Sequence, residues 1–282
     1  MIPVSLLILS WQSHKTLLAT LESYRQNGLL DICDDKLIFF QQISSKDIRI
    51  ARRFGLQYYG AGHNIGIGAA YRYLAERARH PYILYLQNDF KLIHNVQHDP
   101  SELEQGIDLL AHHGIDVVLY RSRQHPGEPN WATDNVQGNE ERWQSHLFNA
   151  LYWLDAPEQV YPDKIQRCPA NPRFLQSTAR FMNYTDNPSL YRREWLLNTL
   201  GDYFVANDPH EITWPEHVIQ PWWQQQDFRI AQAEGLFEHI RLDRGNWRSR
   251  LLQLPIPLFK KLGLYQRLKQ SRWAQKLKNS AG

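Results

Sequence analysis

Cysteine is scarce in this chain, and so are the patterns that disulfide-bonded or zinc-binding proteins need. Only Cys33 and Cys168 occur among the 282 residues, and they are far apart in sequence. Disulfide scaffolds are rich in cysteine, and structural zinc sites place cysteine and histidine at short, regular spacings. The sequence therefore predicts neither kind of site, and it fits a reducing compartment.

The start of the chain lacks the long apolar run of a membrane anchor. The stretch PVSLLIL (residues 3–9) is too short to span a bilayer and has no basic residue before it. No pattern of small residues suitable for signal cleavage follows it. We therefore interpret this stretch as a first β-strand and not as a signal peptide.

Two common phosphate-binding signatures are missing as well. The turn GAGHNIGIG (residues 60–68) does not have the spacing G-x-G-x-x-G, and it follows the third expected strand instead of the first. No G-x-x-x-x-G-K-[ST] loop occurs anywhere. The glycines are expected instead to allow a tight turn beside a ligand, with Asn64 capping or orienting the next helix. Dinucleotide-binding and P-loop enzymes are thus disfavoured.

Charge is distributed unevenly along the chain. The formal net charge is +3, but residues 241–282 contain eleven Lys and Arg against one acid, Asp243, a net of +10. Residues 1–240 accordingly have a net charge of −7. This asymmetry predicts a neutral-to-acidic catalytic body and a basic tail that meets an anionic surface.

Strand-like and helix-like segments alternate in the first 120 residues. Apolar β-prone runs and apolar helical faces predict strands at 4–9, 36–41, 56–59, 82–86 and 116–120 and helices at 16–27, 47–54 and 69–79. Such alternation is typical of a parallel βαβ sheet. Beyond Arg121 the periodicity weakens, and we expect loops and short elements over the C-terminal edge of the sheet.

The segment YILYLQND (residues 82–89) ends an apolar run on polar groups. The run has no polar alternation, as expected of a strand buried on both faces. Burying a carboxylate inside such a strand costs several kcal/mol, so Asp89 should emerge at the C-terminal end, where open α/β sheets bind ligands. A turn carboxylate that caps the next element is the alternative.

The segment GLFEHIRLDR (residues 235–244) has a similar pattern. His239 ends an apolar run and is followed by Arg241. A lone histidine in an apolar stretch is usually a hydrogen-bonded core residue. The basic groups beyond it are able to neutralise phosphates, which favours a ligand role.

Together these segments resemble the family 2-like glycosyltransferases with the GT-A fold. Residues 3–24 are similar to the opening strand and helix of that family, and residues 62–78 to its third-strand turn and helix. YILYLQND stands at the place of the DXD motif, and GLFEHIR resembles the late segment with a metal-binding histidine. The resemblance implies an α/β fold of GT-A type, with a mixed, mostly parallel sheet, flanking helices and a loop-rich acceptor half.

The resemblance covers about residues 1–245, with these landmarks in the family's order. It implies a glycosyltransferase domain at 1–245, in which 1–120 hold the nucleotide sugar and 121–245 the acceptor. Residues 246–282 form a basic, amphipathic C-terminal tail.

A nucleotide-sugar donor and a divalent cation, Mn²⁺ or Mg²⁺, follow from the resemblance. The cation would neutralise the diphosphate leaving group, with Asp89 and His239 as its ligands. Gln87 stands at the place of the first acid, so the motif reads QND, and metal affinity or even metal dependence stays open. The donor-binding residues implied are Ser10, Gln42, Asn64, Gln87, Asn88, Asp89, Arg121 and Arg241.

The family often has an acidic pair after the second strand, where this chain reads QQISSKD (residues 41–47). Gln42 would read the base as an amide donor and acceptor, whereas Asp47 is expected to cap a helix. Arg121 and Arg123 follow a strand, where they would hold a phosphate or an anionic sugar, or be surface charges.

An inverting transfer needs a carboxylate that takes the proton of the acceptor hydroxyl. Glu216 follows Trp214-Pro215, opens an expected helix, and stands where the family often places this base. The alternative is an acid that stabilises the helix N-terminus through the dipole, worth ~0.3–1 kcal/mol. Glu211 and Asp186 are further candidates for the base, and Asp186 is also a plausible hydroxyl binder.

The tail interleaves apolar and basic side chains. Its apolar residues are Leu258, Leu262, Tyr265, Leu268, Trp273 and Leu277. This pattern suits a helix on an anionic membrane face, or a C-terminal helix docked on the domain. The negative body and the lack of a binding motif disfavour nucleic acid as a partner.

The predicted function is transfer of a sugar, hexosyltransferase-like, to a glycan or lipid-linked acceptor in cell-surface polysaccharide assembly. The predicted location is the cytoplasm, at the inner face of the membrane. A weak or inactive sugar- or nucleotide-binding module with this fold is the alternative, because the motif lacks its first acid. A nucleotidyltransferase is disfavoured, because SWQSHK (residues 10–15) lacks the Gly-rich basic loop of that class.

Overall fold

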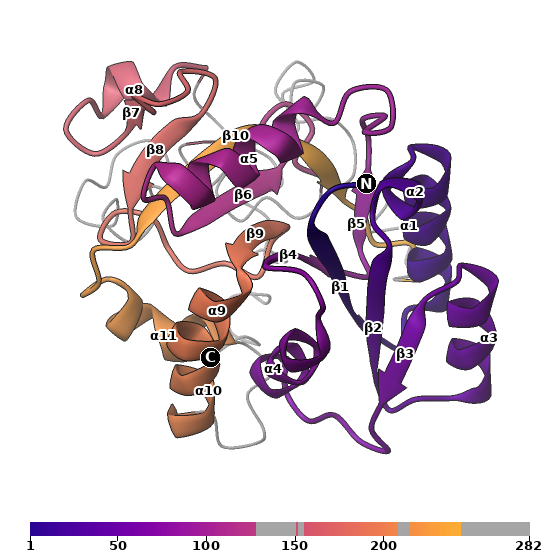
Figure 1. Cartoon of the computed structure of the whole chain (residues 1–282). Coiled ribbons are helices and arrows are strands. Elements are labelled where there is room, and N and C mark those ends of the chain that lie inside the picture. The colour runs from indigo at the N-terminus through magenta and orange to yellow at the C-terminus, as the bar shows by residue number, and fades with distance from the viewer. Residues whose placement is uncertain (128–150, 152–154, 208–214, 244–282) are drawn as a thin grey trace, which may run out of the picture. The chain divides into compact units, whose positions relative to one another are not determined.

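The computed structural model describes residues 1–127, 151, 155–207 and 215–243 (Figure 1). Contacts divide the chain into two compact units, Met1–Asp243 and Arg244–Gly282. The second unit lies outside the described residues, so the predicted membrane-binding tail stays a prediction. The fold below is that of the first unit.

The strands and helices predicted for the first 120 residues are all present, with ends shifted by a few positions. The elements of this part of the chain are β1 (Val4–Trp11), α1 (His14–Gln26), α2 (Leu29–Ile32), β2 (Asp35–Gln41), α3 (Ser45–Arg53), β3 (Gln57–Gly60), α4 (Ile67–Arg77), β4 (Tyr82–Gln87), β5 (Phe90–Leu92), α5 (Ser101–His112) and β6 (Val117–Arg121), of which α2, β5 and α5 were not predicted. The N-terminal apolar stretch is a strand, as predicted.

The second half of the unit adds strands to the same sheet. Its elements are α8 (Pro157–Val160), β7 (Gln166–Arg167), β8 (Leu175–Thr178), β9 (Ser189–Arg192), α9 (Arg193–Trp195), the π-helical turn η2 (Leu196–Gly201), α10 (Asp202–Asn207), α11 (Pro215–Trp223) and β10 (Arg229–His239). We expected loops and short elements here, and most of these elements are indeed short, but β7 to β10 join the main sheet, which the sequence did not indicate. Strands β7, β8 and β9 have only two to four residues, and their partners are distant in sequence, so the sequence does not show where they join the sheet.

The sheet has a parallel core and antiparallel additions. The strand order is β3-β2-β1-β4-β9-β6-β10-β8-β7, with β5 paired to β10. Strands β3, β2, β1 and β4 are parallel neighbours, whereas β9 is antiparallel to both β4 and β6. The predicted mixed α/β sheet with flanking helices is confirmed.

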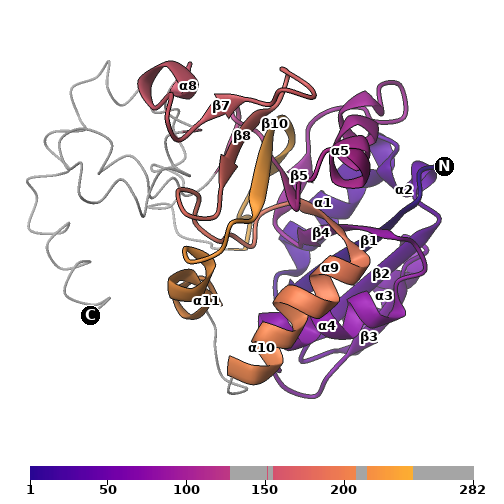
Figure 2. The same cartoon turned by 60° about the vertical axis from the view of Figure 1, so that its left-hand side comes forward.

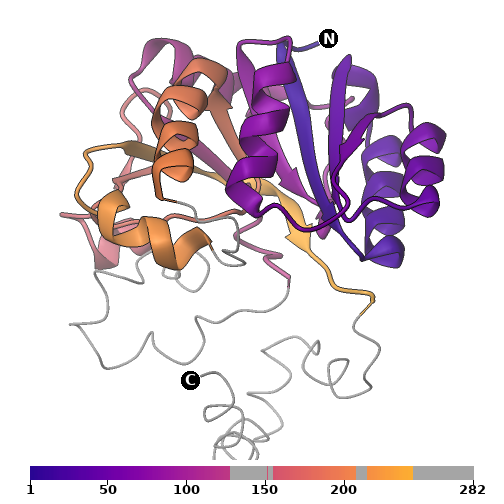
Figure 3. The same cartoon turned by 90° about the horizontal axis from the view of Figure 1, so that it is seen from below.

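Alternating side chains of β1 enter two cores on opposite faces of the sheet. Leu6 and Ile8 pack with residues of α1, α3 and α5, and Leu7 and Leu9 pack with residues of α4, η2, α10 and α11. The turn η2 and helix α10 lie next to α4, and α10 is seen beside α4 in Figure 2. The view from below shows β1 between α4 on one side and α1 on the other (Figure 3). Both faces are therefore covered, which leaves the strand ends for polar groups.

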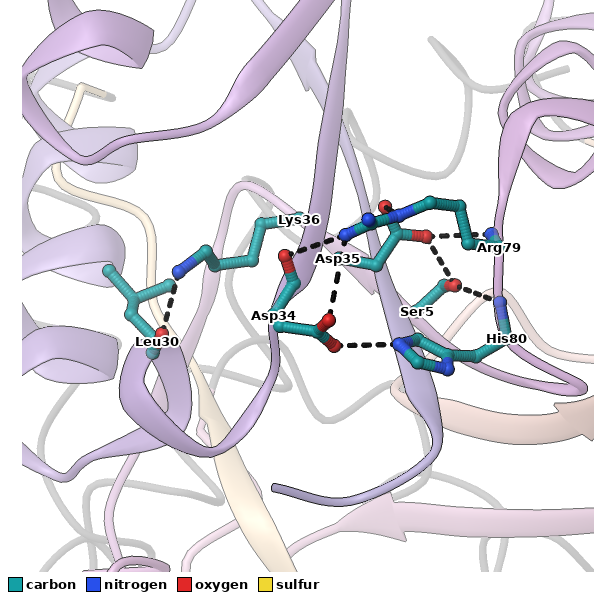
Figure 4. Close-up of polar contacts among 7 residues, drawn as sticks. All are labelled: Ser5, Leu30, Asp34, Asp35, Lys36, Arg79 and His80. Atoms are coloured by element: carbon teal, nitrogen blue, oxygen red, sulfur yellow. Dashed lines mark hydrogen bonds and ion pairs between the residues drawn. The ribbon is translucent and has the colours of Figure 1, made fainter.

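Asp35, a buried carboxylate at the N-terminal end of the parallel strands, has a structural role (Figure 4). Asp35, the first residue of β2, accepts hydrogen bonds from Ser5 Oγ at 2.5 Å and from Nε of Arg79 at 3.0 Å. His80 lies 2.6 Å from Asp34 and donates its backbone N–H to Ser5 Oγ. These bonds tie the connection before β4 to the starts of β1 and β2, so this cluster is not a site candidate.

Candidate functional site

Asp89 and His239 meet at the C-terminal end of β4. Asp89 lies in the turn between β4 and β5, and His239, the last residue of β10, pairs in register with Phe90 of β5. The His239 Nε2 atom is 2.9 Å from Asp89 Oδ2, and the backbone N–H of Ile240 donates to the Asp89 carbonyl at 2.7 Å. Two residues 150 positions apart are thus joined by side chains and backbone, as we expected of Asp89 and His239.

His239 is buried and Asp89 is partly buried, yet each side chain keeps one buried polar atom without a partner among the described residues. The exposed fractions are 16% for the Asp89 side chain and 7% for that of His239. Among the described residues, nothing forms a hydrogen bond with Asp89 Oδ1 or with His239 Nδ1. Because an unpaired buried polar atom costs about 1–3 kcal/mol, these atoms point to a further binding partner.

A divalent cation fits this pair only if the ligand completes its coordination. Within the described part of the chain, no group of three or more His, Cys, Asp or Glu comes together as a self-contained site. One carboxylate with an imidazole is nevertheless a reasonable donor set, because Mg²⁺ is often held by one or two carboxylates plus substrate phosphates and waters. Asp89 and His239 remain the predicted ligands.

Two arginines lie beside the pair. Arg241 Nε is 3.8 Å from Asp89 Oδ2. Arg121, at the end of β6, is 9% exposed, donates to the Pro126 carbonyl at 2.7 Å, and lies over the ring of Phe90 at 5.9 Å. That ring in turn packs on His239, with ring centroids 4.8 Å apart. The alternative in which Arg121 is a surface charge is therefore wrong.

Gln87, at the place of the missing acid, contacts a carboxylate from another segment. Its amide Nε2 donates a hydrogen bond to Asp186 Oδ2, which precedes β9. The neighbouring Asn88 is buried, and its backbone N–H bonds to the Leu9 carbonyl at 2.9 Å, which ties β4 to β1. Asn187, also buried, accepts from Arg121 at 3.4 Å. The predicted site residues Gln87, Asn88 and Asp186 therefore lie at the same strand end as Asp89.

Gln42 lies in a small polar group at the ends of β1 and β2. Its Oε1 accepts from the Trp11 indole at 3.2 Å and from the Gln12 amide. Gln12 has φ 51° and Gln42 φ 56°, the only positive φ values of non-glycine residues in the described chain. Such backbone strain clusters at functional sites, and Trp11 is 47% exposed beside it.

Trp11 and Gln12 were not predicted from the sequence. The only signal in the sequence was a tryptophan at the end of an apolar run, where a large ring is not expected to lie in the core.

Asn64 and Gln41 shape the glycine-rich turn. Asn64 Oδ1 accepts from the Gly66 N–H at 2.9 Å, just before α4, which fits the expected orienting role. Gln41, which the sequence did not single out, donates to the Gly66 carbonyl and accepts from the Ile65 N–H, both at 2.8 Å. Ser10, another predicted donor contact, is buried near the end of β1.

Asp47 caps a helix, as predicted. It forms a reciprocal capping box with Ser44 at the start of α3, and it also lies 2.9 Å from His14. It is therefore engaged at the helix terminus and not presented to a base.

The candidate bases are only partly described. Glu211 lies outside the described residues. Glu216 stands in the first turn of α11, so the predicted helix is present, but its side chain is not described. Asp186 is at the site, bound to Gln87. The identity of the base stays a prediction.

The segment after β10 is fastened across the N-terminus of α1. Asp243 Oδ2 accepts the backbone N–H groups of Lys15 and Thr16, both at 3.1 Å, and the Leu242 N–H bonds to Thr16 Oγ1 at 2.9 Å. Ser13, at the helix N-cap, makes no capping hydrogen bond of its own. Asp243 thus caps α1 and holds Arg241 beside Asp89.

Two largely buried titratable groups next to the sheet, Tyr71 and Glu102, have raised pKa values. Burial, aided by the negative charge of Asp186, holds the pKa of Tyr71 well above its ordinary value. Burial also raises the pKa of Glu102, in α5, to about 7, while the N–H of Gly235 opposes this by donating to its carboxylate at 3.0 Å. Gly235 has φ 97° in an irregular stretch of β10, so Glu102 supports the strand that ends at His239.

In the part of the chain that the structure describes, every helix is too short or too polar to cross a bilayer. The peripheral membrane location therefore stays a prediction.

The fold is that of solved glycosyltransferases of GT-A type. TarS from S. aureus (residues 1–349) is 14% identical, covers 85% of this chain, and superposes with a TM-score of 0.50. The mannosyltransferase PcManGT from Pyrobaculum calidifontis, solved with GDP-Man and Mn²⁺, is 11% identical, covers 89%, and gives 0.54. This chain spans 60% of the length of each. No family model and no curated protein matches it in sequence. At this identity the likeness establishes the GT-A fold.

Proposed function

We propose that this chain is a glycosyltransferase that moves a sugar from a nucleotide-sugar donor to a glycan or lipid-linked acceptor. The observation that carries the proposal is the Asp89–His239 pair, placed with unpaired buried polar atoms at the strand ends of a GT-A fold. In open α/β sheets this edge is where ligands bind. Cell-surface polysaccharide assembly, on the cytoplasmic side of the membrane, is the process in which we place it.

The donor would lie along the C-terminal ends of β1, β2 and β4. Gln42 and Trp11 offer an amide and an exposed ring to the base, and Gln87 and Asn88 would face the ribose. Arg241, held by the Asp243 cap, and Arg121 bring positive charge to the diphosphate. This arrangement accounts for polar groups on every strand end that faces this edge.

A cation held by Asp89 and His239 would neutralise charge on the departing diphosphate. PcManGT, the neighbour solved with GDP-Man and Mn²⁺, supports testing Mn²⁺ first. If chelation with EDTA leaves turnover unchanged, the leaving group is neutralised by Arg241 and Arg121 instead.

We further propose inversion of the anomeric centre with Glu216 as the base. The acceptor oxygen forms a bond to the anomeric carbon while the bond to the diphosphate oxygen breaks, and the acceptor proton passes to the carboxylate. NMR of the product decides the stereochemistry, and a retained configuration would exclude this single displacement.

The experiment that tests the function is a donor panel. The protein is incubated with UDP-, GDP- and dTDP-sugars in Mn²⁺ or Mg²⁺, and release of nucleoside diphosphate is measured with and without glycan acceptors. Acceptor-stimulated release from one donor supports the proposal. No release from any donor, together with no binding, would exclude it.

A catalytically weak sugar-nucleotide-binding module is the second candidate. The observation that favours it is Gln87, which leaves the motif with Asp89 as its single carboxylate. Tight binding of a donor without acceptor-stimulated release is the result that this alternative predicts.

A further inference from the structure

The contact between Gln87 and Asp186 has a direction that chemistry determines. An ionised carboxylate only accepts hydrogen bonds, whereas a glutamine amide donates at Nε2 and accepts at Oε1. The group that Gln87 turns toward Asp186 must therefore be its NH₂, as the structure has it. The carbonyl Oε1 then faces away from Asp186 as an acceptor.

The two residues come from different segments of the sheet. Gln87 ends β4, and Asp186 precedes β9, the strand that pairs with β4 in antiparallel register from Tyr85↔Ser189. Asn187, next to Asp186, is buried and bonded to Arg121. The loop that carries Asp186 is thus held on both sides, and within the described chain no residue donates to Gln87 Oε1.

We infer that Asp186 is a positioning residue: it orients the Gln87 amide so that Oε1 is offered to a hydroxyl of the donor nucleotide. This inference rests on the proposed function. A carboxylate at position 87 would accept a hydrogen bond from a hydroxyl with either of its oxygens. An amide that is not held in place can instead present either its donor NH₂ or its acceptor oxygen to the hydroxyl. Asp186 removes this ambiguity, and a neutral glutamine then acts as an acceptor where an acid is missing.

Variants that exchange the amide and the carboxylate between positions 87 and 186 test the orientation of the Gln87 side chain. In Asp186→Asn the neighbour both donates and accepts, so the Gln87 amide is no longer fixed. In Gln87→Glu two carboxylates face each other, and one of them binds a proton only as the pH falls. In the double variant, the amide introduced at position 186 donates to the carboxylate introduced at position 87. The second oxygen of that carboxylate is then again an acceptor for the nucleotide.

Binding is measured by calorimetry with UDP, GDP and dTDP in Mn²⁺, together with the 2′- and 3′-deoxyribose analogues of the nucleotide that the wild type prefers. We expect Asp186→Asn to bind this nucleotide about 3- to 10-fold more weakly, the value of one hydrogen bond, and to lose part of its preference over a deoxy analogue. Gln87→Glu should bind more weakly than wild type, because two carboxylates then face each other. The double variant should bind within about twofold of wild type.

Asp227→Asn is the matched control, because it removes the same charge from a residue that is 78% exposed and stands before the start of β10, at the far end of that strand from His239. The inference is overturned if the wild type binds a nucleotide and Asp186→Asn binds it equally well, or if the double variant stays as weak as the worse single variant. A fall in kcat alone for Asp186→Asn, with no recovery in the double variant, would also overturn it, because it would identify Asp186 as a base. If the wild type binds none of the nucleotides, the proposed function fails first and this inference fails with it.

Discussion

At the scale of single residues, the chemistry at the strand ends depends on a few carboxylates in different environments. Asp89 is paired with His239, and Asp186 with Gln87. Asp35, at the other end of the sheet, is hydrogen-bonded to Ser5 and Arg79. A base needs a carboxylate that is not already committed to such a partner. Glu216, in the first turn of α11, is our proposed base, because it stands where the family that the sequence resembles often places this residue.

Glu216→Gln should therefore lower kcat by about 10²–10⁴-fold while leaving donor binding nearly unchanged, because only proton transfer is lost. Turnover is measured with saturating donor and acceptor, and donor affinity by titration. His217→Asn, at the adjacent position, is the control. Full activity of Glu216→Gln would move the role to Glu211 or Asp186.

The positions of site residues were predictable where a polar group interrupts an apolar run. Asp89 and His239 both stand at the end of such a run, and the sequence therefore singled them out. Gln12 and Gln42 were harder to predict. Their positive φ values arise from the turns after β1 and β2 and cannot be recognised from the amino-acid composition. Gln42 was found only through the family resemblance, and Gln12 was not found.

At the scale of elements, the position of His239 depends on how β10 and the segment after it are held. Asp243 caps α1 in place of an N-cap side chain. Asp243→Ala should lower the free energy of unfolding by about 1 kcal/mol, the typical value of a helix cap. It should also weaken donor binding, because Arg241 loses its anchor.

Urea denaturation and nucleotide titration check these two effects. Asp243→Asn is the control, because asparagine is an equally good capping residue. If Asp243→Ala changes neither the free energy of unfolding nor the affinity for the nucleotide, the segment after β10 has no role in the site.

The raised pKa of Glu102 should make the free energy of unfolding depend on pH. Its pKa is raised from 4.5 to about 7 in the folded chain, so between these values the folded state binds more protons than the unfolded state. Stability should therefore fall as the pH rises from about 4.5 to 7 and stay constant above. Glu102→Gln, which keeps an acceptor for Gly235, should be about 1–3 kcal/mol more stable than wild type at pH 8.

Urea denaturation of both forms at about pH 4.5 and pH 8 is the measurement. At the lower pH the two should agree closely, because the glutamate is largely protonated in the folded state and half-protonated in the unfolded state. An equal difference at both pH values would refute the assignment of the pH dependence to Glu102.

The sheet was predictable only in part at this scale. Strands β1, β2 and β4 are long enough, and apolar enough along their length, to be recognised from the sequence. Strand β9 has four residues, and nothing local indicates that it lies between β4 and β6. That placement brings Asp186 to Gln87, so this contact was beyond sequence reasoning.

At the scale of the whole molecule, the charge asymmetry separates residues 1–240 from a strongly basic end. Residues 246–282 lie outside the described chain, and their proposed role is to bind the cytoplasmic face of a membrane. Each basic residue contributes about 1 kcal/mol near an anionic leaflet, and the attraction weakens as salt shortens the Debye length from about 10 Å at 0.1 M to about 3 Å at 1 M. A membrane location would bring the site to a lipid-linked acceptor.

Vesicle sedimentation tests this proposal with the full chain and with a variant that lacks residues 246–282. The full chain should sediment with anionic vesicles at low salt and be released at high salt, and the shortened chain should stay in solution. Neutral vesicles are the control. Equal sedimentation of both forms would show that the tail is not the anchor.

The central claim is that the edge around Asp89 binds a nucleotide sugar, and titration of UDP, GDP and dTDP in Mn²⁺ tests it most directly. Wild type and Asp227→Asn should bind at least one of the three alike, and Asp89→Asn should bind it at least about 10-fold more weakly, because the charged contact is lost. Absence of binding by the wild type, or undiminished binding by Asp89→Asn, would contradict the account.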